Sequence, residues 1–97
     1  MYYTLLTWDP DAVAPAYIHM LIVNIPDKRV RNGAAILPYT PPAPPPGTGT
    51  HRYITGLFRQ SQPISLKPMR RDRFNVGKFV RDYGLELIEK RIFTMKS

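Results

Sequence analysis

The sequence of 97 residues contains no cysteine. Disulfide bonds and thiolate metal sites are therefore excluded, and nothing in the chain requires an oxidising compartment. Long hydrophobic runs are absent too, since no segment approaches the roughly 18 apolar residues that span a bilayer. The first residues, MYYTLLTW, lack the basic start and small-residue cleavage site of a secretory signal. We expect a soluble, cytoplasmic protein without a transmembrane segment.

Signatures of catalysis are also missing. The chain has no GxSxG elbow, and no serine lies in a context that suggests a nucleophile. Two histidines and two aspartates could in principle form a two-histidine, one-carboxylate metal site, but the spacing motifs of such sites are absent. We predict a protein that is not an enzyme and has no catalytic residue, metal site or cofactor.

Acidic residues are scarce: 7 Asp and Glu stand against 14 Lys and Arg, which gives a net charge of +7. This surplus favours phosphates, acidic protein surfaces, nucleic acid or anionic lipid heads as partners. Nine of the basic residues lie between Arg59 and Arg91, where four acidic residues interrupt them. That mixture is typical of a solvated face, so nucleic acid is not the favoured partner.

Composition predicts a mostly β fold. Eleven prolines and six glycines indicate many turns and little continuous helix, whereas 43% hydrophobic residues are too many for a disordered chain. A chain of this length forms at most one domain with a small core, which we place at residues 1–97.

Residue patterns predict strands at 2–8, 18–25, 34–39, 51–60 and 91–96. One short helix is expected in the C-terminal half, at 74–83, with Gly84 as its stop. Asn32-Gly33 predicts a tight hairpin between the second and third strands. Because side chains alternate along a strand, His51 and Tyr53 should point to the same face.

Polar residues gather where these strands begin or end: Asp9, Asp11, His19, His51 and Tyr53. Antiparallel pairing could bring all five to one end of the sheet. Two imidazoles, a phenol and the backbone N–H groups of Gly47-Thr48-Gly49 would make a cradle for a phosphate or carboxylate.

Simpler interpretations exist for single members of this group. His19, alone on an apolar strand, would most simply be a core histidine bonded to a carbonyl or carboxylate. Arg52 points away from His51 and is expected to pair with a buried carboxylate, Asp11 being the candidate.

The segment PPAPPP, from Pro41 to Pro46, precedes the histidine strand. A rigid loop of this kind could hold the cradle in place and lower the ordering cost of binding. Its two PxxP frames, Pro41–Pro44 and Pro42–Pro45, could also present a polyproline helix to an SH3 or WW module. Since strands bound the segment, a structural clamp is the favoured interpretation.

Five motifs occur in a fixed order: DPDA, the strand YIHMLIVN, the loop ending in GTGTHRY, the tripeptide FRQ, and RFNV followed by YGL. In this order they resemble the phosphatidylethanolamine-binding protein (PEBP) family. The resemblance implies a globule around a large β-sheet with a pocket for phosphate, acetate or a phospholipid head group. It also implies a non-enzymatic module that engages a protein partner, such as a kinase or scaffold, in signalling.

Site residues follow from the same motifs. The resemblance places Asp9, His19, Pro45, His51 and Tyr53 in the ligand pocket, with Asp11 and Tyr17 at its rim or wall.

The chain also departs from the family, whose members are usually about twice as long. The strands that precede DPD are almost wholly absent, and so is the late C-terminal helix. A truncated sheet leaves edges with unpaired backbone groups. We therefore expect a homo-oligomer or a subunit of a complex.

An alternative function belongs to a different class. The segments NIPDKRVRNG (Asn24–Gly33) and PYTPPAP (Pro38–Pro44) are similar to a PEBP-like protein of the mitochondrial ribosome. They imply a structural subunit of a larger assembly, and the basic surplus suits that setting. The intact pair of histidines with Tyr53 favours the binding module.

Overall fold

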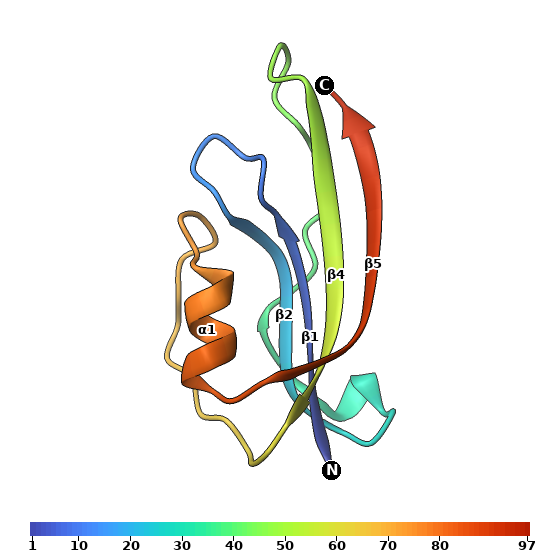
Figure 1. Cartoon of the computed structure of the whole chain (residues 1–97), viewed down its shortest axis with the longest axis vertical. Coiled ribbons are helices and arrows are strands. Elements are labelled where there is room, and N and C mark those ends of the chain that lie inside the picture. Colours follow the sequence, from blue (N-terminus) through green and yellow to red (C-terminus); the bar gives the residue numbers. More distant parts are fainter.

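The computed structural model covers all 97 residues and contains one antiparallel sheet of five strands, in the order β3-β2-β1-β4-β5 (Figure 1). The strands are β1 (Tyr2–Asp9), β2 (Tyr17–Pro26), β3 (Ala34–Leu37), β4 (Thr50–Gln60) and β5 (Glu86–Lys96). The predicted mostly β class, with one short helix in the C-terminal half, is confirmed.

The helix α1 (Val76–Asp82) begins and ends where the sequence provides caps. The side chain of Asn75 accepts a hydrogen bond from the backbone N–H of Lys78, and Gly84 takes the positive φ of +59° that favours glycine after a helix. The predicted helix is confirmed and is shorter at both ends. With seven residues, α1 is far too short to cross a bilayer, and the structure offers no other helix that could do so.

The core lies between α1 and one face of the sheet, with α1 against β1 and β2 (Figure 1). It joins residues of four strands to α1 and to the segments on either side of it: Leu6, Ile18, Leu21, Val23, Leu37, Phe58, Ile64, Phe79 and Leu85.

A polar network joins β2 to β4 at the end of the sheet remote from Asp9. Asn24 donates to the carbonyl of Ile64 and accepts from its N–H, while Gln60 donates to the Asn24 amide oxygen. Thr4 in turn donates to the Gln60 amide oxygen at 2.7 Å. These bonds satisfy buried polar groups and hold the segment after β4 against the sheet.

The connection between β2 and β3 differs from the prediction. Instead of a tight Asn32-Gly33 hairpin, it contains a short 3₁₀ helix, η1 (Val30–Asn32), and Gly33 is extended at φ −78°. Gly33 is needed for space: a Cβ there would come within 2.7 Å of side-chain carbons of Ile22 and Ile25. The predicted antiparallel pairing of these two strands is confirmed, although β3 ends at Leu37.

β5 is longer than the predicted strand at 91–96, since it begins at Glu86 and pairs with β4 from Arg59 to Thr50. All of its residues are exposed. An edge strand without a buried face needs no alternation of apolar and polar residues, so the pattern did not indicate its first half.

Candidate functional site

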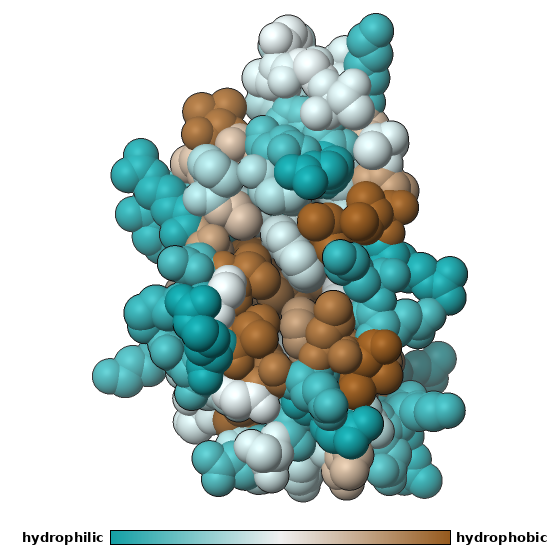
Figure 2. All heavy atoms as spheres, in the orientation of Figure 1, coloured by the Kyte–Doolittle hydropathy of each residue, from teal (hydrophilic) through white to brown (hydrophobic).

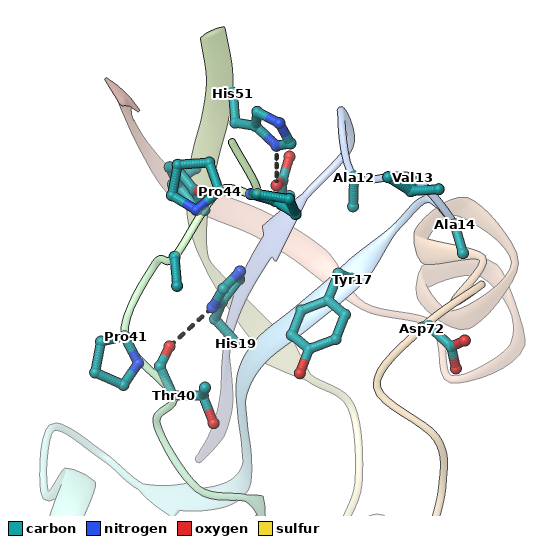
Figure 3. Close-up of a pocket in the computed structure, with 14 residues that line it drawn as sticks. Ala12, Val13, Ala14, Tyr17, His19, Thr40, Pro41, Pro44, His51 and Asp72 are labelled. Atoms are coloured by element: carbon teal, nitrogen blue, oxygen red, sulfur yellow. Dashed lines mark hydrogen bonds and ion pairs between the residues drawn. The ribbon is translucent and has the colours of Figure 1, made fainter. Parts of the chain in front are cut away.

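A cavity of about 400 Å³ lies at the end of the sheet where β1 stops and β2 and β4 start (Figure 3). Fourteen residues line it: Asp9, Ala12, Val13, Ala14, Tyr17, His19, Thr40, Pro41, Ala43, Pro44, Pro45, His51, Tyr53 and Asp72. The prolines of the loop before β4 form one of its walls.

Strand register creates this convergence. Asp9 at the end of β1 pairs with Tyr17 at the start of β2, and Trp8 pairs with Ile54 of β4. His51 and Tyr53 are two residues apart on β4 and reach the same cavity, as alternation along the strand predicted.

Asp9 and His51 form a buried pair at the back of the cavity. The Asp9 Oδ2 lies 2.6 Å from the His51 Nδ1, and the two side chains are only 5% and 1% exposed. The Asp9 Oδ1 accepts a hydrogen bond from the backbone N–H of Asp11 at 2.8 Å. Both carboxylate oxygens of Asp9 are therefore engaged: one positions the His51 ring, and the other positions the backbone of the turn after β1.

The other nitrogen of His51 is also engaged. Its Nε2 lies 2.7 Å from the Thr48 hydroxyl oxygen, and that hydroxyl donates its one proton to the Pro45 carbonyl at 2.7 Å. The Thr48 oxygen must then accept from the His51 Nε2–H. These bonds tie the tip of the proline loop to the sheet.

His19 is held differently, because only one of its nitrogens is engaged within the protein. Its Nδ1 donates to the Thr40 carbonyl at 2.8 Å, which fixes the proton on that nitrogen. Tyr17 and Tyr53 pack edge-on against the ring, with centroids 5.0 and 5.2 Å away. The Nε2 has no partner in the chain, and Figure 3 shows it directed into the cavity, away from Thr40.

Tyr53 provides a second unpaired polar atom. The residue is almost fully buried, yet its hydroxyl makes no hydrogen bond within the chain. Burial, and then the negative charge of Asp9, raise the pKa of Tyr53 above its usual value of 10.0. The phenol therefore keeps its proton at neutral pH. No fully buried side-chain nitrogen or oxygen lacks a partner, so this hydroxyl and the His19 Nε2 are reached from the cavity.

Asp72 stands on the far side of the cavity from Pro41 and Thr40 (Figure 3). Its carboxylate accepts two hydrogen bonds from Arg70, at 2.9 and 3.0 Å, and these bonds lower the pKa of Asp72. The lining of the cavity thus includes a negative group, Asp72, and unpaired polar atoms on His19 and Tyr53.

Arg71, which lies between Arg70 and Asp72 in the sequence, supports the site from outside the cavity. Its guanidinium donates to the backbone carbonyls of Ile18, His19 and Pro38 at 2.8 to 3.3 Å. It therefore joins the start of β2 to the chain just before Thr40, the two segments that position the His19 ring.

Six of the seven predicted site residues line the cavity: Asp9, Tyr17, His19, Pro45, His51 and Tyr53. Asp11 does not line it. As predicted, Asp11 pairs with Arg52, through contacts of 2.9 and 3.0 Å from the guanidinium, but the carboxylate is at the surface and not buried. These bonds hold the pKa of Asp11 at about 2.

The predicted cradle of Gly-Thr-Gly backbone amides is wrong. The N–H of Thr48 bonds to the Pro45 carbonyl, and the N–H of Gly49 bonds to the Ser97 hydroxyl. Sequence analysis also missed the Thr40 carbonyl, Asp72 and Arg71. A backbone carbonyl has no residue signature, but the position of Thr40 beside the proline segment and the RRDR run could have directed attention to these places.

Comparison with known proteins identifies the family. A model described as phosphatidylethanolamine-binding protein matches residues 1–94. The chain belongs to the phosphatidylethanolamine-binding protein family. The resemblance in the sequence motifs is thus confirmed. Among its PEBP relatives, the protein BROTHER of FT and TFL 1 of Arabidopsis thaliana is 33% identical over 93 residues. That match covers 87% of this chain and 51% of the relative, so the chain spans about half of its length.

Solved structures agree on the PEBP fold. The carboxypeptidase Y inhibitor, solved in complex with its cognate proteinase, superimposes with a TM-score of 0.82 at 21% identity, over 96% of this chain and 58% of that one. A phosphatidylethanolamine-binding protein from Plasmodium vivax gives 0.72 at 21% identity, over 96% and 62%.

Proposed function

We propose that this PEBP-family chain is a non-enzymatic binding module whose cavity takes a phosphate or the phosphoryl head group of a phospholipid. One observation carries the proposal: the His19 Nε2 and the Tyr53 hydroxyl, both without a partner in the chain, face one cavity. Because both atoms are reached from the cavity, a ligand that enters it can complete their hydrogen bonds.

The proposed ligand must be an anion that accepts hydrogen bonds. Tyr53 donates through its protonated phenol, and His19 donates from Nε2 once it carries a second proton, because Nδ1 already holds the first. A phosphate oxygen is well suited, since hydrogen bonds between charged groups are the stronger kind.

The rest of the cavity supports a preformed site. The Asp9–His51 pair and the Thr48 hydroxyl fix the proline loop, so little chain entropy is lost when a ligand enters. A volume of about 400 Å³ lies within the range of small-ligand pockets.

A protein partner is the second part of the proposal. The carboxypeptidase Y inhibitor was solved with its cognate proteinase, so a protein with this fold forms a protein complex. Fold alone does not determine function. The family resemblance nevertheless favours a regulator or scaffold in signalling, with a kinase or scaffold protein as the class of partner.

Local charge pairing makes a structural subunit on RNA less favourable. Within the basic C-terminal half, Arg70 pairs with Asp72, Lys78 with Asp82 and Arg91 with Glu89. Arg71 is engaged with backbone carbonyls. These pairings leave a mixed surface in place of the continuous basic patch that nucleic acid prefers.

The test is a titration of the purified chain with inorganic phosphate, followed by NMR of the His19 and His51 ring signals and by calorimetry. Tyr53→Phe removes only a hydroxyl and should weaken binding about tenfold, the effect of losing one hydrogen bond to a charged group. His19→Phe should weaken it further. Lys28→Gln, in the turn after β2 at the other end of the sheet, removes a positive charge and should leave the affinity unchanged.

Two outcomes would contradict the proposal: unaltered binding in both cavity variants, or an equal loss in Lys28→Gln. Vesicles of phosphatidylethanolamine and of phosphatidylcholine, compared with free phosphate, distinguish a lipid head group from the free anion.

A further inference from the structure

β5 is an unpaired edge that carries large apolar side chains. It pairs with β4 on one side and has no neighbour on the other. Five of its residues are large, hydrophobic and between 38% and 52% exposed: Leu87, Ile88, Ile92, Phe93 and Met95. Figure 1 shows β5 as the outermost strand, and Figure 2 shows hydrophobic atoms among hydrophilic ones along that side of the molecule.

The two edges of the sheet are unequal. β3 has four residues, whereas β5 has eleven and is paired along β4 for nearly its full length. Long edges with apolar side chains offer backbone N–H and C=O groups to another strand, and proteins usually shorten or cover them. The edge at β5 is therefore the one that can accept a further strand.

The charged residues of β5 indicate which strand would pair with this edge. The acidic residues, Glu86 and Glu89, lie in the first half, and the basic residues Lys90, Arg91 and Lys96 follow. If β5 aligned with a parallel copy of itself, like charges would face each other. An antiparallel copy centred on Lys90 places Glu89 of each strand against Arg91 of the other, and opposite charges across strands stabilise pairing. Lys90 is then the one charged residue of β5 that faces a like charge.

We propose that β5 pairs antiparallel with β5 of a second copy of this chain, around a two-fold axis at Lys90. In this register Glu89 faces the partner's Arg91, and Lys90 faces the partner's Lys90 at the axis. The register between β4 and β5 shifts between Leu87 and Glu89 and leaves Ile88 without a partner on β4, so regular pairing extends from Glu89 onward. The two-fold axis makes the contact self-complementary and closes the assembly at two chains.

Light scattering distinguishes a second copy of this chain from other strands that could cover β5. A strand from another protein, or from a longer form of this one, could cover β5 in place of a second copy. In either case the isolated chain would stay monomeric. Light scattering of the purified full chain at about 100 μM should give a dimer, and a monomer at that concentration overturns the proposal.

The lack of cysteine permits a direct measurement of the register. A Lys90→Cys variant places two thiols opposite each other, within the Cα separation that a disulfide needs, and mild oxidation should convert most of the chain to a covalent dimer. In the Thr94→Cys control the two α-carbons would lie about 27 Å apart, at about 3.4 Å per residue. Equal crosslinking of both variants, or of neither, contradicts the proposed pairing.

A charge exchange tests the same contact without a covalent bond. Glu89→Arg places arginine opposite the partner's Arg91 and should raise the dimer dissociation constant at least tenfold. Because Glu89 and Arg91 also pair within one chain, the control is a mixture of Glu89→Arg chains with Arg91→Glu chains, which restores opposite charges only across the contact and should recover most of the affinity as a heterodimer. Failure of this mixture to form the heterodimer, with circular dichroism unchanged, would show that these residues do not face each other.

Discussion

β4 and β5 are neighbouring strands of eleven residues each, yet their surroundings are opposite. β4 lies between β1 and β5 and buries residues on both faces, among them His51, Tyr53 and Phe58. β5 has one neighbour and no buried residue. Both strands carry phenylalanine and β-branched residues. Position in the sheet, more than residue type, therefore decides which side chains are buried.

Two alanine substitutions give the largest expected contrast. Phe58 on β4 is 4% exposed and belongs to the core, so Phe58→Ala should cost about 3–5 kcal/mol of unfolding free energy. Phe93 on β5 is 47% exposed, and Phe93→Ala should cost about 1 kcal/mol in the monomer. Urea unfolding measures both. Comparable losses at low protein concentration would contradict the difference in burial between the two strands. A loss for Phe93→Ala that grows with protein concentration would indicate that Phe93 is covered in the dimer.

Asp9→Ala should be nearly as damaging, although it removes a polar group. It leaves the buried His51 Nδ1 without its partner, and breaking a buried pair costs about 3–5 kcal/mol. Urea unfolding against Asp82→Ala, an exposed aspartate paired with Lys78, provides the matched control. Equal small losses in the two variants would mean that the buried pair adds little to stability.

Arg71→Lys should have an intermediate effect. Lysine keeps the charge and loses the planar fork that reaches three carbonyls, so we expect a loss of about 1–3 kcal/mol. Phosphate affinity should fall as well, because Thr40 and the start of β2 would no longer hold the His19 ring. Retained affinity at reduced stability would show that Arg71 supports the fold without positioning the site.

The smallest effect is expected for Arg52, on the outer face of β4. Arg52 lowers the pKa of Asp11 from 3.8 to about 2, so the pair stabilises the fold above about pH 4 and loses this contribution as the pH falls toward 2. Arg52→Met should lower the melting temperature slightly at pH 6, since the pair is solvent-exposed. Calorimetry at pH 6 and pH 2.5 should find a smaller difference at the lower pH; a constant difference would contradict this linkage.

Burial also explains what the sequence could predict. The sequence predicts β1, β2 and β4 because their buried positions carry apolar residues, in continuous runs for β1 and β2 and in an alternating pattern for β4. The shared cavity of Asp9, His51 and Tyr53 follows from antiparallel register. The first half of β5 has no such pattern. The Asn32-Gly33 prediction failed because tertiary packing of Gly33 against Ile22 and Ile25 outweighed the local turn preference.

Contacts to the backbone were the least predictable part of the site. The bonds of Arg71 to three carbonyls, and of His19 to the Thr40 carbonyl, depend on the path of the chain in space. The Gly-Thr-Gly amides illustrate the same limit, because their partners are a proline carbonyl and the terminal serine.

The aromatic ring of Tyr53 lies between His19, at 5.2 Å, and Phe93, also at 5.2 Å. One side of this row belongs to the cavity and the other to the outermost strand. A molecule that settles on Phe93 and one that settles beside His19 would therefore restrain the same ring. Thermodynamic linkage makes any such coupling mutual: whatever factor one occupant adds to the affinity of the other, it receives in return.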